Sequence, residues 1–151
     1  MAIREIVVVG SADEEILRKS CRPVTDFDGK LHTLLDDMAE TMYFEGRGVG
    51  LAAPQIGIRR QIFVADVGDD TGLHEFINPE IVEMEGEVVS SEGCLSIPGV
   101  NGDVLRPEKV TIRAQDRFGK EFTLIAEDFL AICICHEYDH LTGTLFTDKV
   151  V

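Results

Sequence analysis

A short pattern near the end of the sequence constrains the fold most: residues 136–140 read H-E-Y-D-H, an example of H-E-x-x-H. On a helix, this spacing sets two imidazoles one turn apart with a carboxylate beside them, the core of a site for a metal and an activated water. The segment that follows, 141–151, contains no His, Cys or Glu and only Asp148 as a carboxylate. Phe146 stands where a metzincin continuation would need a third His. We therefore expect a helix whose third metal ligand comes from upstream.

Size and composition set broad limits. The chain has 151 residues, 44% hydrophobic and 28% charged, which predicts one domain, residues 1–151, with a core that needs no disulfide. No apolar run approaches the roughly 20 residues of a membrane span, and no signal peptide is evident, so we expect a cytoplasmic protein. The net charge of −14 argues against binding to nucleic acid or to an anionic membrane.

Hydrophobic periodicity predicts two main helices and several strands. Leu31, Leu35, Met38 and Met42 recur at helical spacing, and Thr25 or Asp26 could cap the start of that helix. The expected strands, with Gly86 as a bulge in the third, are 61–67, 73–77, 81–89, 109–115 and 121–125. A last helix should run over 128–141 and stop at Gly143. The predicted fold class is α+β, with mostly antiparallel sheets packed around a central C-terminal helix that carries H-E-x-x-H.

The last helix should present one continuous face. Phe129, Ile132, Cys133, His136 and His140 recur at i, i+3, i+4, i+7 and i+11, so an apolar lining leads into the two histidines. The alternative is a pair of hydrogen-bonded core histidines beside a surface glutamate. The position of the pattern on an inward helix face favours the metal site.

Four upstream residues could supply the missing ligand: Cys21, His32, His74 and Cys94. His32 has polar neighbours and His74 follows a flexible turn, so both are expected at the surface, and Cys21 is typical of a small buried hydrophobe. Cys94 lies in E-G-C-L-S, where Gly93 removes a side chain beside the thiol and permits a close backbone approach. Because one ligand is missing, Cys94 is the favoured candidate.

A glycine-rich stretch at 48–55 reads G-V-G-L-A-A-P-Q. Such a loop can run its backbone along a ligand and aim the Gln55 amide at a polarised oxygen, although taken alone it is more typical of a plain turn. It matches neither a dinucleotide fingerprint nor a P-loop.

Together, G-V-G-L-A-A-P-Q, E-G-C-L-S and H-E-Y-D-H resemble, in this order and spacing, the three signature motifs of peptide deformylase. The resemblance covers nearly the whole chain, including 36–43 and 77–79. It is similar to the type I bacterial and organellar enzymes, which remove the N-formyl group from nascent chains. The function implied is a metal-dependent hydrolase that releases formate from formyl-methionyl peptides.

The resemblance also implies a metal centre. Its ligands would be Cys94, His136 and His140, holding one divalent ion, with Fe²⁺ the usual native metal and Zn²⁺, Ni²⁺ or Co²⁺ able to occupy the same site. A metal-bound hydroxide would attack the formyl carbon, while Glu137 acts as the catalytic acid and base.

The substrate contacts follow from the same resemblance. The Gln55 amide and the backbone N–H of Leu95 would stabilise the oxyanion, and the backbone of Gly50 would hold the formyl-methionine amide. The other substrate-binding residues implied are Val49, Glu92, Gly93, Phe129, Ile132 and Cys133. The implied partners are N-formyl-methionyl nascent chains, with transient contact to the ribosome and no direct binding of nucleic acid or membrane.

Departures and alternatives bear on this prediction. Cys135 stands where relatives commonly have Gln, for which we expect a local packing change, and Asn101 lies near a position where many carry Arg. The chain ends at Val151 without the C-terminal helix of many type I relatives. A non-catalytic protein that binds metal or formyl-peptide in the same pocket is one alternative function. An endopeptidase is another, but it would need an open cleft and a downstream ligand.

Overall fold

The computed structural model describes residues 2–45 and 49–151, so residues 1 and 46–48 lie outside the described residues, including Gly48 of the predicted glycine-rich stretch. The described residues form two α-helices and three short 3-10 helices: α1 (Gly29–Glu45), α2 (Asp128–His140), η1 (Glu14–Arg18), η2 (Ala53–Ile56) and η3 (Phe146–Asp148). The strands are β1 (Gly50–Ala52), β2 (Ile62–Ala65), β3 (His74–Glu85), β4 (Val88–Cys94), β5 (Ile97–Arg106), β6 (Lys109–Gln115) and β7 (Glu121–Glu127).

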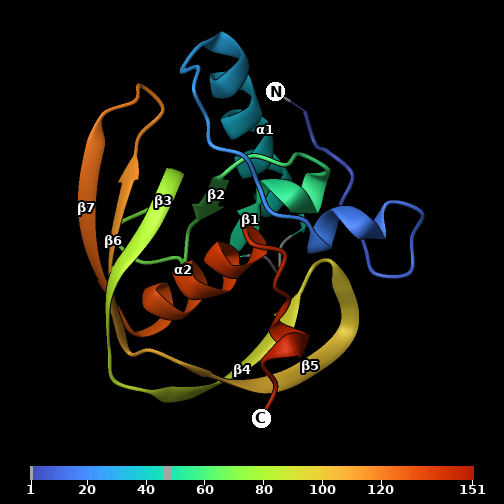
Figure 1. The fold of residues 1–151 in the computed structure, drawn as a ribbon, viewed down its shortest axis with the longest axis vertical. Coiled ribbons are helices and arrows are strands. Elements are labelled where there is room, and N and C mark those ends of the chain that lie inside the picture. The colour runs from blue at the N-terminus through green and yellow to red at the C-terminus, as the bar shows by residue number, and fades with distance from the viewer. Residues whose placement is uncertain (1, 46–48) are drawn as a thin grey trace.

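The strands form two antiparallel sheets. Five of them pair in the order β1-β2-β3-β6-β7, and β4 pairs with β5 in a separate hairpin. Figure 1 shows α2 at the centre of the molecule, with the large sheet on one side and the β4–β5 hairpin on the other. The α+β class, with antiparallel sheets packed around a C-terminal helix, is therefore confirmed.

Strand β2 shows how both helices are held on one sheet. Ile62 and Val64 pack in a cluster with α1, whereas Phe63 and Ala65 pack in the cluster with α2. All four side chains are fully buried. A short apolar run of this kind is typical of a strand that is covered on both faces.

Helix α1 follows the predicted periodicity, and Leu35, Met38 and Met42 are fully buried along it. The predicted capping residue, Thr25 or Asp26, is wrong. The helix begins at Gly29, and the Asp28 carboxylate accepts a hydrogen bond of 3.1 Å from the Leu31 N–H. Asp28 thus satisfies a backbone donor that the first turn leaves free.

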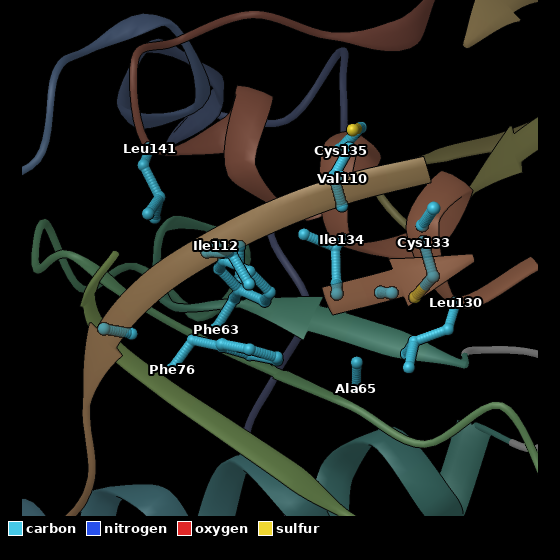
Figure 2. Close-up of a cluster of buried hydrophobic side chains, with 14 of the residues drawn as sticks. Phe63, Ala65, Phe76, Val110, Ile112, Leu130, Cys133, Ile134, Cys135 and Leu141 are labelled. Carbon is cyan, nitrogen blue, oxygen red and sulfur yellow. The ribbon is translucent and has the colours of Figure 1, made fainter. Parts of the chain in front are cut away.

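Helix α2 packs its apolar face on the aromatic side chains of the sheet (Figure 2). Ile134 is fully buried in this cluster, where the rings of Phe63 and Phe76 stack with centroids 4.6 Å apart. As predicted, the helix ends just before Gly143, which has a φ of 77°. A Cβ at Gly143 would lie 2.4 Å from the Arg18 carbonyl oxygen, so the turn requires glycine.

The segment 86–106 departs most from the sequence prediction. Gly86 is not a bulge in a continuous strand; it lies between β3 and β4 with a φ of 72°. β5, which the sequence did not predict, is mostly exposed over 98–103 and contains Gly99 and Gly102. Such a segment lacks the alternation by which a half-buried strand is recognised.

Candidate functional site

Three side chains from two elements meet beside the hairpin. Cys94 ends β4, whereas His136 and His140 lie on α2, and one ligand atom from each lies within 4.8 Å of the others. The Cys94 Sγ is 3.5 Å from the His140 Nε2. The structure therefore brings together the thiol and the two imidazoles that the sequence analysis assigned to one metal centre.

The alternative upstream ligands lie elsewhere. The Nε2 of His32 is 2.8 Å from the Arg117 carbonyl oxygen, and the Nε2 of His74 is 2.8 Å from the Thr71 Oγ1. Cys21 is buried in the apolar cluster beneath α2, as expected for a small hydrophobe. Cys94 is the upstream candidate that joins the two histidines.

The donor set fits a first-row divalent metal, because a thiolate and imidazoles suit ions such as Zn²⁺ and Fe²⁺. Burial lowers the pKa of His140 to about 3, so this imidazole is neutral and able to ligate. Burial also acts to lower the pKa of His136, but hydrogen bonds with Cys94 and Glu92 outweigh it and raise this pKa to about 10. A metal would compete with that proton, which is the usual linkage of metal binding to proton release.

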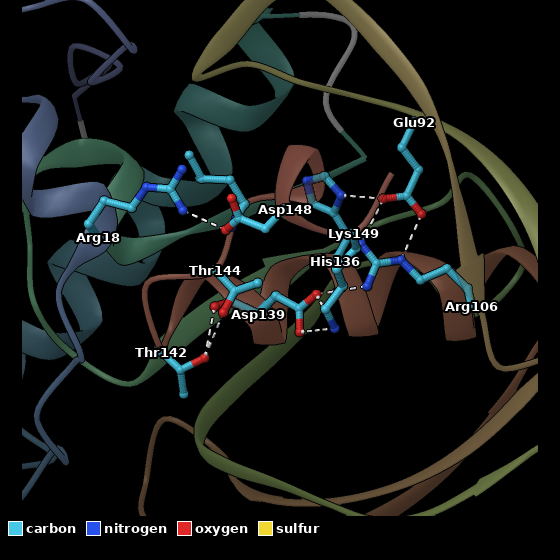
Figure 3. Close-up of polar contacts among 10 residues, drawn as sticks. Arg18, Glu92, Arg106, His136, Asp139, Thr142, Thr144, Asp148 and Lys149 are labelled. Carbon is cyan, nitrogen blue, oxygen red and sulfur yellow. Dashed lines mark hydrogen bonds and ion pairs between the residues drawn. The ribbon is translucent and has the colours of Figure 1, made fainter. Parts of the chain in front are cut away.

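Glu92 contacts His136 of the ligand cluster. Its Oε1 lies 2.9 Å from the His136 Nδ1, while Arg106 donates to both carboxylate oxygens at 2.8 Å (Figure 3). Burial would raise the pKa of Glu92, but these partners lower it to about 2. The ionised carboxylate therefore accepts the Nδ1 proton of His136 and leaves the Nε2 for the ligand cluster.

Sequence reasoning missed Arg106, since a lone Arg is ordinarily a surface residue. The sequence V-L-R at 104–106 does not alternate in polarity, but in the structure Val104 and Arg106 are buried and Leu105 between them is exposed. A strand assignment would have placed Arg106 on the inward face.

Glu137 is buried beside the ligand cluster, and its Oε1 has no hydrogen-bond partner among the described residues. Burial raises its pKa to about 7. A carboxyl group with a pKa near neutrality can both accept and return a proton. Gly50 lies against it: a Cβ at that position would meet the Cγ and Oε2 of Glu137 at 2.8 Å and the Sγ of Cys133 at 2.9 Å.

Gln55 is also buried beside the ligand cluster. Its Oε1 accepts a hydrogen bond of 3.0 Å from the Ala52 N–H. This bond orients the side-chain amide. Its Nε2 donates to the Cys94 Sγ at 3.4 Å and to the Ser96 Oγ at 3.2 Å. The amide NH₂ is thus directed towards the ligand cluster.

A cavity of about 620 Å³ unites these groups. Every predicted site residue lines it except His140, which is buried. The predicted residues in its wall are Val49, Gly50, Gln55, Glu92, Gly93, Cys94, Leu95, Phe129, Ile132, Cys133, His136 and Glu137.

The hairpin adds wall residues that sequence reasoning did not assign, over 97–101. Among them is Asn101, whose Oδ1 would lie 2.8 Å from a Cβ at Gly93, so Gly93 leaves room for this side chain. The other departure, Cys135, is buried in the apolar cluster with α2, consistent with a packing role.

Comparison with known proteins identifies the family. The family model described as polypeptide deformylase matches residues 3–151. The chain belongs to the polypeptide deformylase family. A peptide deformylase from Acetivibrio thermocellus is 55% identical over 151 residues, which is all of this chain and 85% of that relative. The resemblance stated from three motifs is therefore confirmed, and the chain is a deformylase-type hydrolase of a metal-dependent family.

Solved deformylases share the fold. The Thermotoga maritima peptide deformylase is 39% identical with a TM-score of 0.93, covering 100% of this chain and 99% of that one. The Synechococcus elongatus enzyme, solved in complex with actinonin, is 40% identical with a TM-score of 0.89, covering 97% and 78%. Within the described part of this deformylase, no helix is long and apolar enough to cross a membrane.

Proposed function

We propose that residues 1–151 act as one catalytic domain that removes the N-terminal formyl group from formyl-methionyl peptides and releases formate. The observation that carries this proposal is the position of Glu137. Its buried carboxylate, unpartnered at Oε1 among the described residues, faces the same cavity as the Cys94–His136 cluster and the Gln55 amide. A proton carrier, an amide donor and a metal-binding set thus surround one space.

Cys94, His136 and His140 would hold one divalent metal, with Fe²⁺ as the proposed native ion and Zn²⁺, Ni²⁺ or Co²⁺ able to replace it. When bound, such an ion supplies an acidified water and polarises the carbonyl oxygen of the substrate. Glu92 keeps the His136 ring oriented through the Nδ1 hydrogen bond of 2.9 Å.

Glu137 carries the proton. It accepts one from the attacking water as the oxygen–carbon bond to the formyl group forms, and returns it to the amine nitrogen as the carbon–nitrogen bond breaks. The products are formate and a peptide with a free amino terminus. The pKa of about 7, raised by burial, suits both transfers near neutral pH.

Gln55 and Leu95 are the proposed oxyanion donors, through the side-chain NH₂ and the backbone N–H. The Ala52 N–H holds the Gln55 carbonyl oxygen, so the NH₂ is oriented before the substrate arrives. Removal of one such donor typically costs about 3 kcal/mol in the transition state.

The methionine side chain would occupy the apolar part of the cavity, formed by Val49, Phe129, Ile132 and Cys133. Gly50 lets the peptide backbone approach, since any side chain there would overlap Glu137 and Cys133. Close walls around the formyl group are needed to reject an acetyl group, because a missing methyl in a loose pocket discriminates by only about 1–3 kcal/mol.

The proposed substrates are nascent chains, so the proposed place of action is the cytoplasm, with transient contact to the ribosome.

Formate release from formyl-Met-Ala-Ser by anaerobic, iron-loaded protein tests the proposal. We expect turnover with the formyl peptide, little with acetyl-Met-Ala-Ser, and none with metal-free protein. Cleavage of an internal peptide bond would indicate an endopeptidase. Binding of the formyl peptide without formate release would indicate a non-catalytic binding protein and would contradict the proposal.

A further inference from the structure

Arg106 lies between the two elements that supply the ligand cluster (Figure 3). On one side is Glu92, two residues before Cys94 on β4. On the other is Asp139, which precedes His140 on α2. β4 and α2 are separated by more than thirty residues of chain, so contacts between distant segments help to set their relative position.

The contacts of Arg106 use its whole guanidinium group. Its Nε and Nη2 donate to the two carboxylate oxygens of Glu92 at 2.8 Å, and its Nη1 donates to the Asp139 Oδ2 at 2.7 Å. The Arg106 side chain is 2% exposed. The planar guanidinium group binds one carboxylate with two donors and the other carboxylate with a third donor. It therefore fixes the distance and angle between the two carboxylates, which a single point charge cannot do.

We propose that Arg106 is a positioning residue that joins β4 to α2 and so holds the thiol and imidazole ligands at one place before the metal binds. This inference rests on the proposed role of Cys94, His136 and His140 as a metal centre. Arg106 is not among the residues that line the cavity, and it acts through Glu92 and Asp139.

Two effects follow from this arrangement. Arg106 holds Glu92 in place, and Glu92 orients the His136 ring through its Nδ1. Arg106 also links that carboxylate to Asp139, on the same helix as both histidines. Loss of a partner that orients a ligand typically reduces metal affinity about 10–100-fold. Without Arg106, metal binding itself would have to order the ligand side chains. Part of the binding free energy would be used for this ordering, so the net affinity would fall.

Lys149 provides an internal comparison, because its Nζ is 3.1 Å from the same Asp139 Oδ2. This side chain is 45% exposed, and an exposed ion pair contributes little net stabilisation. Lys149 contacts Asp139 but makes no contact with Glu92 in the described structure. A substitution of Lys149 therefore removes a positive charge beside Asp139 and leaves the link between Asp139 and β4 in place.

Arg117 is a matched control elsewhere in the molecule. Its Nε and Nη2 donate to the two oxygens of Glu75 at 3.0 and 2.6 Å, and its Nη2 lies 3.0 Å from the Asp36 Oδ1. It therefore also bridges two carboxylates from two elements, here β3 and α1, neither of which supplies a ligand. Its side chain is 26% exposed.

The test compares Arg106→Lys with Arg117→Lys and Lys149→Met, each titrated with Co²⁺ as metal-free protein. Visible absorption gives both the affinity and the ligand-field spectrum, and neither readout depends on catalysis. We expect Arg106→Lys to bind Co²⁺ 10–100-fold more weakly with an altered spectrum, and the other two variants to bind within threefold of the parent protein. Parent-like affinity and spectrum in a folded Arg106→Lys protein would overturn the proposal.

Lysine keeps a cation beside the buried carboxylates, which avoids leaving both unpaired. Should Arg106→Lys still fail to fold, Asp139→Asn removes only the α2 side of the link and is expected to weaken Co²⁺ binding in the same direction. Unchanged affinity there would equally overturn the inference. A parent protein that binds Co²⁺ with the predicted Arg106 dependence, yet releases no formate when iron-loaded, would end the proposed function and leave this inference standing.

Discussion

Asp37 on α1 and Glu137 on α2 are both buried carboxylates, in residues 3% and 5% exposed, but their surroundings differ. Asp37 accepts hydrogen bonds from the Ala2 N–H at 2.7 Å and from the Arg4 Nε and Nη2 at 3.0 and 2.8 Å. Glu137 has an Oε1 with no partner among the described residues. One helix buries a carboxylate with its partners, and the other buries one without them.

The two pKa values move in opposite directions as a result. Burial would raise the pKa of Asp37, but the hydrogen bonds from Arg4 and Ala2 hold it below its ordinary value. For Glu137, burial dominates and raises the pKa to about 7. A buried carboxylate that is fully paired stabilises the fold, whereas one left unpaired in a cavity is available for proton transfer.

The largest expected effect is on the reaction rate and comes from Glu137 on α2. Glu137→Ala should lower the rate of formate release by about 10³-fold, because it removes the proton carrier. Metal content should remain, and the free energy of unfolding should not fall, since a costly buried carboxyl group has gone. The checks are formate release, metal analysis and urea unfolding of the same preparation. A near-normal rate would show that Glu137 does not carry the proton.

Gln55 is a third buried polar side chain, whose oxygen accepts from Ala52 and whose NH₂ donates to Ser96 and Cys94 beside the site. Gln55→Leu should lower the rate by about 10²-fold, corresponding to one lost oxyanion donor. The metal should still bind when supplied in excess, because Cys94, His136 and His140 are all retained. Steady-state kinetics with formyl-Met-Ala-Ser would measure it, and an effect on KM alone would argue for ground-state binding only.

On the α1 side, Asp37→Asn should act on stability and not on chemistry. Loss of the charged hydrogen bonds to Arg4 and Ala2 should reduce the free energy of unfolding by about 2 kcal/mol. The rate per folded molecule should stay at the parent value, since Asp37 is not among the residues that line the cavity. Urea unfolding paired with kinetics checks both. A large loss of rate in fully folded protein would remove the distinction between the two carboxylates.

The smallest expected effect is the pH dependence of the stability difference between the parent protein and Asp37→Asn. The pKa of Asp37 in the folded protein lies below its ordinary value of 3.8. The ionised carboxylate therefore contributes its full stabilisation of the fold above the unfolded-state pKa, and this stabilisation is lost as pH falls through the folded-state pKa. The stability gap between parent and Asp37→Asn, measured on metal-free protein, should therefore be constant from pH 7 to 5 and shrink below pH 4. A gap that persists at pH 2 would assign the stabilisation to something other than ionisation.

Local patterns account for what the sequence could predict. The buried face of α1 follows from the spacing of Leu35, Met38 and Met42, and the order of motifs is sufficient to assign Cys94, His136 and His140 to one centre. These features depend on residues close together in the chain or on a family resemblance.

The parts that were missed depend on distant segments. β5 is exposed over most of its length and is paired with β4, so its own residues do not show a strand pattern. The link from Glu92 through Arg106 to Asp139 joins three segments, and Arg106 and Asp139 look like surface charges until those segments pack together. Burial and pairing of charges are tertiary properties, and no local rule reports them.

The central claim is that one sulfur and two imidazole nitrogens from β4 and α2 hold one cation. X-ray absorption of the zinc-loaded protein tests this directly. The account predicts one sulfur at about 2.3 Å and nitrogen neighbours, two of them from histidine, at about 2.0–2.1 Å. It also predicts that the sulfur contribution disappears in Cys94→Ser. A shell without sulfur in the parent protein, or a sulfur contribution that survives in Cys94→Ser, would contradict the account.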